Sequence, residues 1–208
     1  VGTRSGSGSV AKTNSDILTD LTVIKRYTSA SEYWAWTPRL VGNQTLQSNS
    51  TDGELSGAMA PSPWDTMTGA FCAASNGATN TSTLVDYSFK RAPGYHDVVC
   101  YSGSGSSPQV LSHNLTVVPE MMLVKDRGAS TNWYVYTAAL GNTKALYLDG
   151  SGTPTTSAVF WNNTSPTSTQ FTVGSFPSGV GNYAAYLFAT CPNVSKVGTY
   201  TGTGTTQQ

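Results

Sequence analysis

Apolar and polar residues alternate with a period of two in short runs along the chain, each bounded by Gly, Pro, Asn or Ser. The clearest runs, rich in aromatic and β-branched residues, are "NWYVYT" (132–137), "ALYLD" (145–149), "QFTV" (170–173) and "YAAYLF" (183–188), with "TVIK", "YWAW" and "LVDYSF" at matching places earlier in the chain. This pattern is typical of β-strands, and no segment longer than a turn has an apolar helical stripe. The spacing of the runs predicts an all-β sandwich or jelly roll.

One phrase occurs three times, at both ends and in the middle of the chain. It reads "VGTRSGSG" at 1–8, "DVVCYSGSG" at 97–105 and "KVGTYTGTG" at 196–204. Val1, Val98 and Val197 therefore mark one phase of an internal repeat of about 100 residues. We expect two tandem repeats, 1–92 and 93–208, and equivalent strands at the three phrases. Either the chain is part of a longer array, or the phrase is a strand that each unit shares with the next.

The repeat extends between these marks. Residues 21–36 align with 121–136 without a gap, which pairs Lys25 with Lys125, Tyr33 with Trp133, Trp34 with Tyr134, and Trp36 with Tyr136. Residues 87–105 align with 186–204 and share seven identical residues. A unit of this size buries a modest core, so we expect one copy to pack on the other or on another chain.

The composition excludes several classes of function. Eleven basic residues balance eleven acidic ones, and only 11% of the 208 residues are charged. Nucleic-acid binding and polybasic membrane association need a basic surface, so neither is expected. No apolar run approaches the roughly 20 residues that span a bilayer, so we expect no membrane insertion. The start lacks both a Met and the apolar core of a signal peptide, and we expect a fragment, a processed product or a piece of a longer protein.

No motif indicates catalysis or a bound metal or cofactor. His96 and His113 are the only histidines, neither recurs in the other copy, and no "GxSxG" sequence accompanies them. We assign both to structural or surface roles. Carboxylates are scattered, without an obvious pair for glycoside hydrolysis. The three cysteines, an odd number without short spacings, fit neither a disulfide framework nor a zinc site. We therefore predict a protein that is not an enzyme and that carries no cofactor or metal, with buried or free thiols.

The aromatic residues are the best candidates for ligand binding, because their faces can stack on the apolar C–H faces of sugar rings. The candidates are Trp34, Trp36, Trp64, Trp133, Tyr134 and Trp161. Successive residues of a strand point to opposite faces, so one set belongs to a core and the other is exposed or lies between copies. Because aromatic residues recur in both copies, a core or interface role is favoured over glycan contact for each of them.

Several stretches resemble a module found, often in tandem, in tail-fibre and other virion proteins of tailed bacteriophages, commonly marine phages and cyanophages. The resemblance rests on "VVPEMMLVK" (117–125), "FWNNTSPTSTQFTVG" (160–174) and "KVGTYTGTG" (196–204), and it covers nearly the whole chain. The first copy is more divergent, and "LSHNL" (111–115) stands where the family usually has a His-Gly-Leu turn. The resemblance implies a concanavalin-like β-sandwich and no catalytic motif.

The resemblance also implies a function. It indicates a non-enzymatic structural component of a phage virion, most of all a tail fibre or adhesin that contributes to host attachment. The expected partners are other virion proteins and further copies of the chain, in a homo-oligomer such as a trimer. Two alternatives remain: a receptor module at the fibre tip that binds a host surface glycan, and a capsid decoration or head-fibre protein.

Overall fold

The computed structural model describes residues 2–5, 10–12, 18–26, 33–56, 71–73 and 83–204, and it places the side chains of residues 18–25, 33–56 and 85–204. This part of the chain is nearly all β and forms several antiparallel sheets, as the period-two pattern predicts. Its two short helical segments are the 3-10 turn η1 (Arg39–Val41) and the single turn α1 (Ala158–Trp161). We call residues 1–92 the first half and residues 93–208 the second half.

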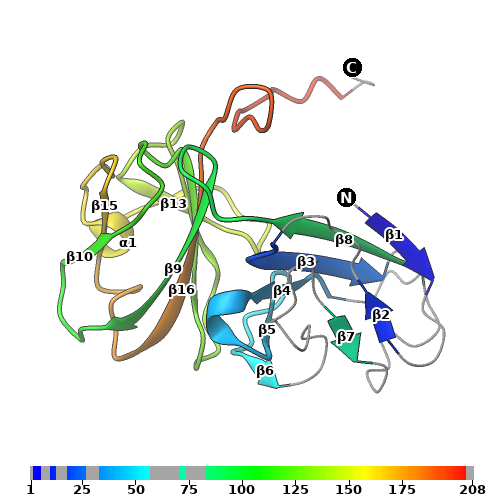
Figure 1. Cartoon of the computed structure of the whole chain (residues 1–208). Helices are drawn as coiled ribbons and strands as arrows, with labels where there is room; N and C mark the ends of the chain where they lie inside the picture. The colour runs from blue at the N-terminus through cyan, green and yellow to red at the C-terminus, as the bar shows by residue number, and fades with distance from the viewer. Residues whose placement is uncertain are drawn as a thin grey trace.

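The second half is a β-sandwich-like pair of sheets (Figure 1). Its large sheet has the order β14-β13-β12-β11-β16-β9, with bounds β14 Thr155–Thr156, β13 Lys144–Tyr147, β12 Tyr134–Thr137, β11 Met121–Asp126, β16 Gly181–Phe188 and β9 His96–Gly103. The small sheet pairs β10 (Gln109–Ser112) with β15 (Gln170–Val173). Between the large sheet, the small sheet and α1 lies an inner core that includes Met122, Tyr136, Trp161 and Phe171. Alternate residues of each strand supply it, because side chains along a strand point to opposite faces.

The first half contains a second six-stranded sheet and a second two-stranded sheet. The large sheet has the order β1-β8-β3-β4-β5-β6, with bounds β1 Gly2–Ser5, β8 Thr83–Phe89, β3 Leu21–Arg26, β4 Ala35–Pro38, β5 Gln44–Gln47 and β6 Leu55–Ser56. The small sheet pairs β2 (Val10–Lys12) with β7 (Phe71–Ala73). Read from the opposite edge, the large sheet has the same order of strands as the large sheet of the second half.

Backbone details recur at the same places in both halves. The amide of Asp20 donates to Phe89 O at 2.8 Å, and the amide of Glu120 donates to Phe188 O at 2.9 Å. Gly42 lies in the loop after β4, and Gly141 lies in the loop after β12. Their φ values are 69° and 77°, a region that favours glycine. The two halves therefore share local geometry as well as strand order.

The strand register corrects the gapless alignment of 21–36 with 121–136. Val23 lies opposite Trp36, whereas Leu123 lies opposite Val135, so Trp36 corresponds to Val135 and not to Tyr136. The loop before β4 is one residue longer than the loop before β12. The loop after β4 is one residue shorter than the loop after β12, which restores the alignment. Register is fixed by which side chains face the core, so the extra residue is absorbed in the loops.

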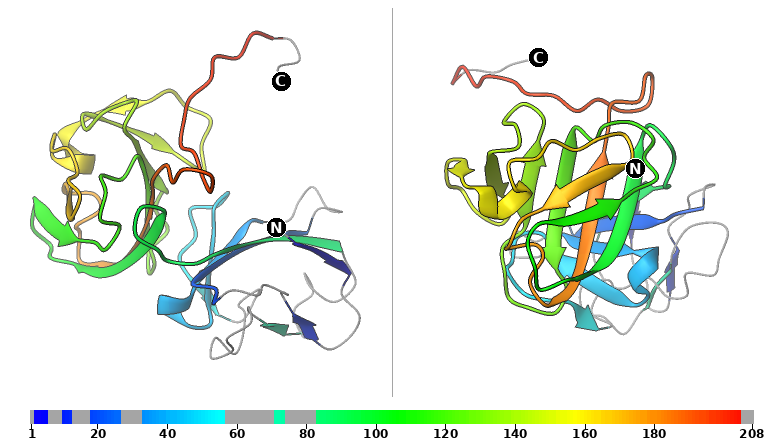
Figure 2. Two further views of the ribbon diagram at one scale, coloured as in Figure 1. Left: turned by 45° about the horizontal axis from the view of Figure 1, so that its top comes forward. Right: turned by 90° about the vertical axis from the view of Figure 1, so that its left-hand side faces the viewer.

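A shared core joins the two halves. It contains Leu21, Val23 and Leu46 from the first half and Leu123, Trp133 and Tyr186, among others, from the second. Corresponding faces of the two large sheets meet here, and Phe89 packs edge-on against its counterpart Phe188 with ring centroids 6.1 Å apart. Figures 1 and 2 show the strands of the two sheets crossing at a steep angle, so the faces diverge away from the contact.

A loop of the first half is also anchored to the second half. Glu54 forms a two-pronged ion pair with Arg127, at 2.5 Å to Nε and 3.1 Å to Nη2, and its amide donates to Arg127 O at 2.6 Å. The hydroxyls of Thr51 and Ser130 lie 3.2 Å apart beside them. These contacts fix the loop after β5 against the loop between β11 and β12.

The three phrases do not share one conformation. The first two supply β1 and β9, which are edge strands in the same position of the two large sheets. Residues 196–204 form no strand; they extend from the body of the molecule (Figure 2), and the Tyr200 side chain is 88% exposed. The expectation of three equivalent strands is therefore wrong for the third phrase, because a strand needs a neighbouring strand to pair with its backbone.

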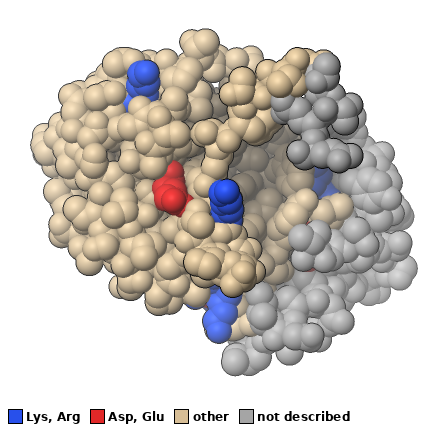
Figure 3. Space-filling model, turned by 90° about the horizontal axis from the view of Figure 1, so that it is seen from above, with Lys and Arg blue, Asp and Glu red and all other residues tan. Residues whose placement is uncertain are grey.

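Charged groups are sparse on the face shown in Figure 3, where the Lys, Arg, Asp and Glu side chains are scattered. No helix within the described residues is long and apolar enough to cross a membrane.

Candidate functional site

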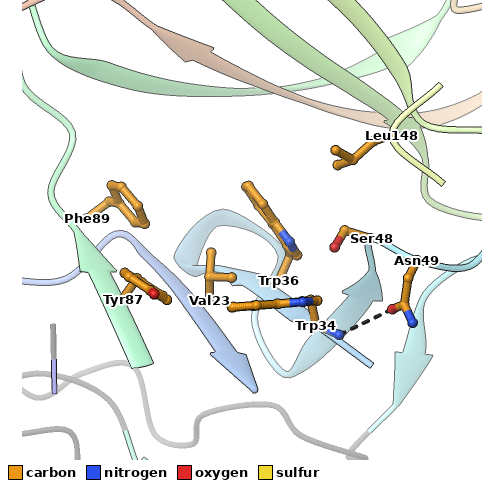
Figure 4. Close-up of a pocket in the computed structure, with 8 residues that line it drawn as sticks. All are labelled: Val23, Trp34, Trp36, Ser48, Asn49, Tyr87, Phe89 and Leu148. Carbon is orange, nitrogen blue, oxygen red and sulfur yellow. Dashed lines mark hydrogen bonds between the residues drawn. The ribbon is translucent and has the colours of Figure 1, made fainter. Parts of the chain in front are cut away.

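A groove of about 430 Å³ opens where the two halves diverge (Figure 4). The first half supplies most of its lining, and Leu148 projects from the second half on the opposite side. The described residues that line it are Val23, Trp34, Trp36, Ser48, Asn49, Tyr87, Phe89 and Leu148. The volume lies within the range of small-molecule sites, and the lining combines aromatic faces with a few polar groups.

Strand register brings the apolar lining together. Val23 of β3 lies between Trp36 of β4 and Tyr87 of β8, opposite both in the antiparallel ladder. Directly opposite residues place their side chains on the same face of a sheet. Phe89 follows Tyr87 by two residues and therefore joins the same face. Neighbouring side chains on one face of the first large sheet thus form most of the apolar lining.

Trp34 is held at the rim of this apolar lining. Its amide donates to Asn49 Oδ1 at 3.2 Å, and its carbonyl accepts from the Ser48 amide at 3.1 Å. The Trp34 ring lies 6.1 Å from the Tyr87 ring at 36°, and Lys25 Nζ lies 5.4 Å from the Trp34 ring centroid. The side chain is half-buried, so ring surface remains open to the groove.

Trp36 connects the groove to the shared core. Its ring packs against Trp133 and Tyr186, at centroid distances of 5.7 and 5.2 Å. Its indole nitrogen, Nε1, is buried and has no hydrogen-bond partner among the described residues. A buried donor without an acceptor costs about 1–3 kcal/mol.

In the second half, the backbone of Trp133 makes the same hydrogen bonds as that of Trp34, but its side chain is buried. The carbonyl of Trp133 accepts from the Leu148 amide at 3.1 Å, and its amide donates to Asp149 Oδ1 at 2.8 Å, as Trp34 does with Ser48 and Asn49. Trp133 is fully buried, and its Nε1 donates to Gln47 O at 2.9 Å. Trp133 is a structural residue between the halves.

The remaining predicted aromatic residues lie apart from the groove. Trp161 is fully buried in the inner core, and its Nε1 donates to Lys144 O at 2.9 Å. Tyr134 is 7% exposed in the same core, where burial raises its pKa to about 12. Trp64 lies outside the described residues. Of the five candidates that the structure describes, it brings only Trp34 and Trp36 together at an open site.

Sequence reasoning missed Tyr87, Phe89, Asn49, Ser48 and Leu148. The alternation in "LVDYSF" places Tyr87 and Phe89 on one face and could have nominated them. Nothing in the sequence shows that Leu148 faces the first half across the groove.

Both histidines are buried rather than exposed. His96 is 0% and His113 is 6% exposed. Burial lowers the pKa of His96 to about 4 and also lowers the pKa of His113. His96 packs against the rings of both Phe89 and Phe188, at centroid distances of 5.6 and 4.6 Å, and so belongs to the junction of the halves.

Among the described side chains, no group of three or more His, Cys, Asp or Glu residues is placed to hold a metal ion. Cys100 and Cys191 are free thiols, both half-buried. The prediction of buried or free thiols is consistent with these two residues, and the side chain of Cys72 lies outside the described residues.

Comparison with known proteins gives a family for more than half of the chain. No curated protein and no solved structure matches it. A family model described as "Domain of unknown function (DUF7483)" matches residues 96–208, which begin at β9 and include every strand of the second large sheet. The chain therefore belongs to the DUF7483 family, whose function is unknown.

Proposed function

We propose that the chain consists of two copies of one concanavalin-like or jelly-roll unit and that it is a non-enzymatic structural component of a bacteriophage virion. Its place is a tail fibre, where it contributes to host attachment. The observation that carries the proposal is the matched strand order of the two large sheets, whose corresponding faces share one core. Two units joined by a shared core suit a stiff building block of an appendage. The phage origin rests on the resemblance of the three stretches named above.

Immunogold labelling of intact phage particles, with serum raised against this chain, tests this proposal. Label on tail appendages is the expected result. Label spread over the capsid would make the chain a head-fibre or decoration protein. Particles without label would refute the virion assignment.

The proposal includes self-association, because fibres are built from repeated chains. We expect a homo-oligomer, with a trimer as the form to look for first. Light scattering coupled to size-exclusion chromatography measures it, and a monomer at all concentrations would contradict this part of the proposal.

A second candidate function is that of a carbohydrate-binding receptor module. The groove favours it, because Trp34 and Tyr87 offer aromatic surface in an open depression that also contains Ser48 and Asn49. Aromatic faces and a few placed polar groups are what a sugar ring needs. Saturable binding of host surface polysaccharide to the intact chain would support this function.

A further inference from the structure

Two corresponding tryptophans of the two halves, Trp34 and Trp133, differ in exposure. Trp34 and Trp133 occupy corresponding backbone frames, yet Trp133 is 0% exposed whereas Trp34 lines an open groove. A tryptophan that served only the fold would be buried in both halves, as Trp133 is. Of the two corresponding rings, Trp34 is therefore the one available to a ligand.

Around Trp34 the groove has the features of a site for a ring with one apolar face and several hydroxyls. The rings of Trp34 and Tyr87 lie close together at an angle, and Leu148 limits the space on the opposite side (Figure 4). Ser48 and Asn49 contribute polar side chains at one end.

We propose that this groove binds a neutral hexopyranose unit, a step that rests on the carbohydrate-binding function proposed above. The C–H face of the sugar lies on the Trp34 ring, and its hydroxyls face the polar side chains of Ser48 and Asn49. A volume of about 430 Å³ suits one or two sugar rings rather than a long chain.

The lining also indicates which ligands fit poorly. None of the described residues that line the groove carries a formal charge, and the Lys25 ammonium beside it lies 5.4 Å from the centroid of the Trp34 ring. A purely apolar ligand would leave the polar side chains of Ser48 and Asn49 without hydrogen bonds to the ligand. A neutral sugar suits both the aromatic surface and these polar groups.

The test uses the full chain with maltose, lactose and cellobiose as probes. Saturation-transfer NMR should show transfer to sugar C–H protons, and titration should quench tryptophan fluorescence. Trp34→Ala should weaken binding about tenfold, the size of effect expected for an aromatic contact. Tyr33→Ala is the matched control, because Tyr33 is an aromatic neighbour that is 41% exposed and does not line the groove. It should bind like the parent.

Urea denaturation of each variant shows whether the fold is kept. A Trp34→Phe variant, which retains a smaller ring, should bind between the parent and Trp34→Ala and serves if the alanine variant does not fold.

Failure to bind all three neutral disaccharides would overturn this inference, and so would binding that is unaffected by Trp34→Ala. Binding of a glucuronic-acid disaccharide instead would show that the assigned sugar class is wrong. Binding of the apolar dye ANS alone, lost in Trp34→Ala, would make the groove a site for apolar ligands. Immunogold labelling is independent of all these outcomes: tail label without sugar binding refutes only this inference, and sugar binding without label refutes only the virion assignment.

Discussion

Acid should weaken the junction of the two halves through His96. The ring packs against both Phe89 and Phe188 and is fully buried. His96 Nδ1 lies 3.0 Å from Leu187 O, so Nδ1 carries the proton and donates it to this carbonyl. Nε2 is buried and has no hydrogen-bond partner within the part of the chain that the structure describes. Protonation of His96 would place a charged N–H at Nε2, where no described group accepts it.

The magnitude follows from the two pKa values. Burial lowers the pKa of folded His96 to about 4 from an ordinary 6.5, although Asp97 and Asp20 oppose the shift and Arg91 adds to it. The unfolded chain then binds a proton between these pH values and the folded chain does not, so stability falls as the pH drops from 6.5 to 4. The loss is about 2 kcal/mol between pH 7 and pH 5, and about 3 kcal/mol once the pH is below 4.

Urea denaturation at pH 7 and pH 5 measures this loss, with His96→Phe as the test variant. The phenyl ring takes the place of the imidazole against Phe89 and Phe188 and cannot be protonated. The variant should lie within about 1 kcal/mol of the parent at pH 7, since it loses one hydrogen bond, and it should lose about 2 kcal/mol less on going to pH 5. His113→Gln is the control and should keep the His96 contribution. Equal pH dependence in the parent and His96→Phe would refute the reasoning.

Three further predictions concern packing, and urea denaturation measures each of them. Gly103→Ala should destabilise the chain by several kcal/mol, since its Cβ would clash with the carbonyl of Gly179, whereas Gly198→Ala, which meets nothing within 4 Å, should change stability by less than about 0.5 kcal/mol. Trp133→Ala should cost about 3–5 kcal/mol, because it empties the shared core and removes a hydrogen bond between the halves; a cost below 1 kcal/mol would mean that the halves do not pack as described. Glu54→Gln should cost about 1–2 kcal/mol, since it removes the negative charge paired with Arg127, and an unchanged midpoint would show that the ion pair contributes nothing.

Much of the candidate site could be anticipated from local pattern. The runs "YWAW" and "LVDYSF" predict strands, and Trp34 and Trp36 are candidates because aromatic faces suit sugars. Their spacing of two residues also predicts that both side chains lie on the same side of the extended segment that leads into β4. What the pattern could not supply was the register between strands, and a single extra residue in a loop moved the counterpart of Trp36 from Tyr136 to Val135.

The sequence by itself determined the all-β class, the positions of most strands and the matched elements of the two halves, because alternation and turn residues act over a few neighbouring positions. Only the tertiary structure decided which aromatic residues are buried and which are open. Trp34 and Trp133 have the same local frame, and their different exposure arises from what the other half places over each of them. Burial depends on contacts between segments about 100 residues apart, and such contacts are not encoded in any local stretch of sequence.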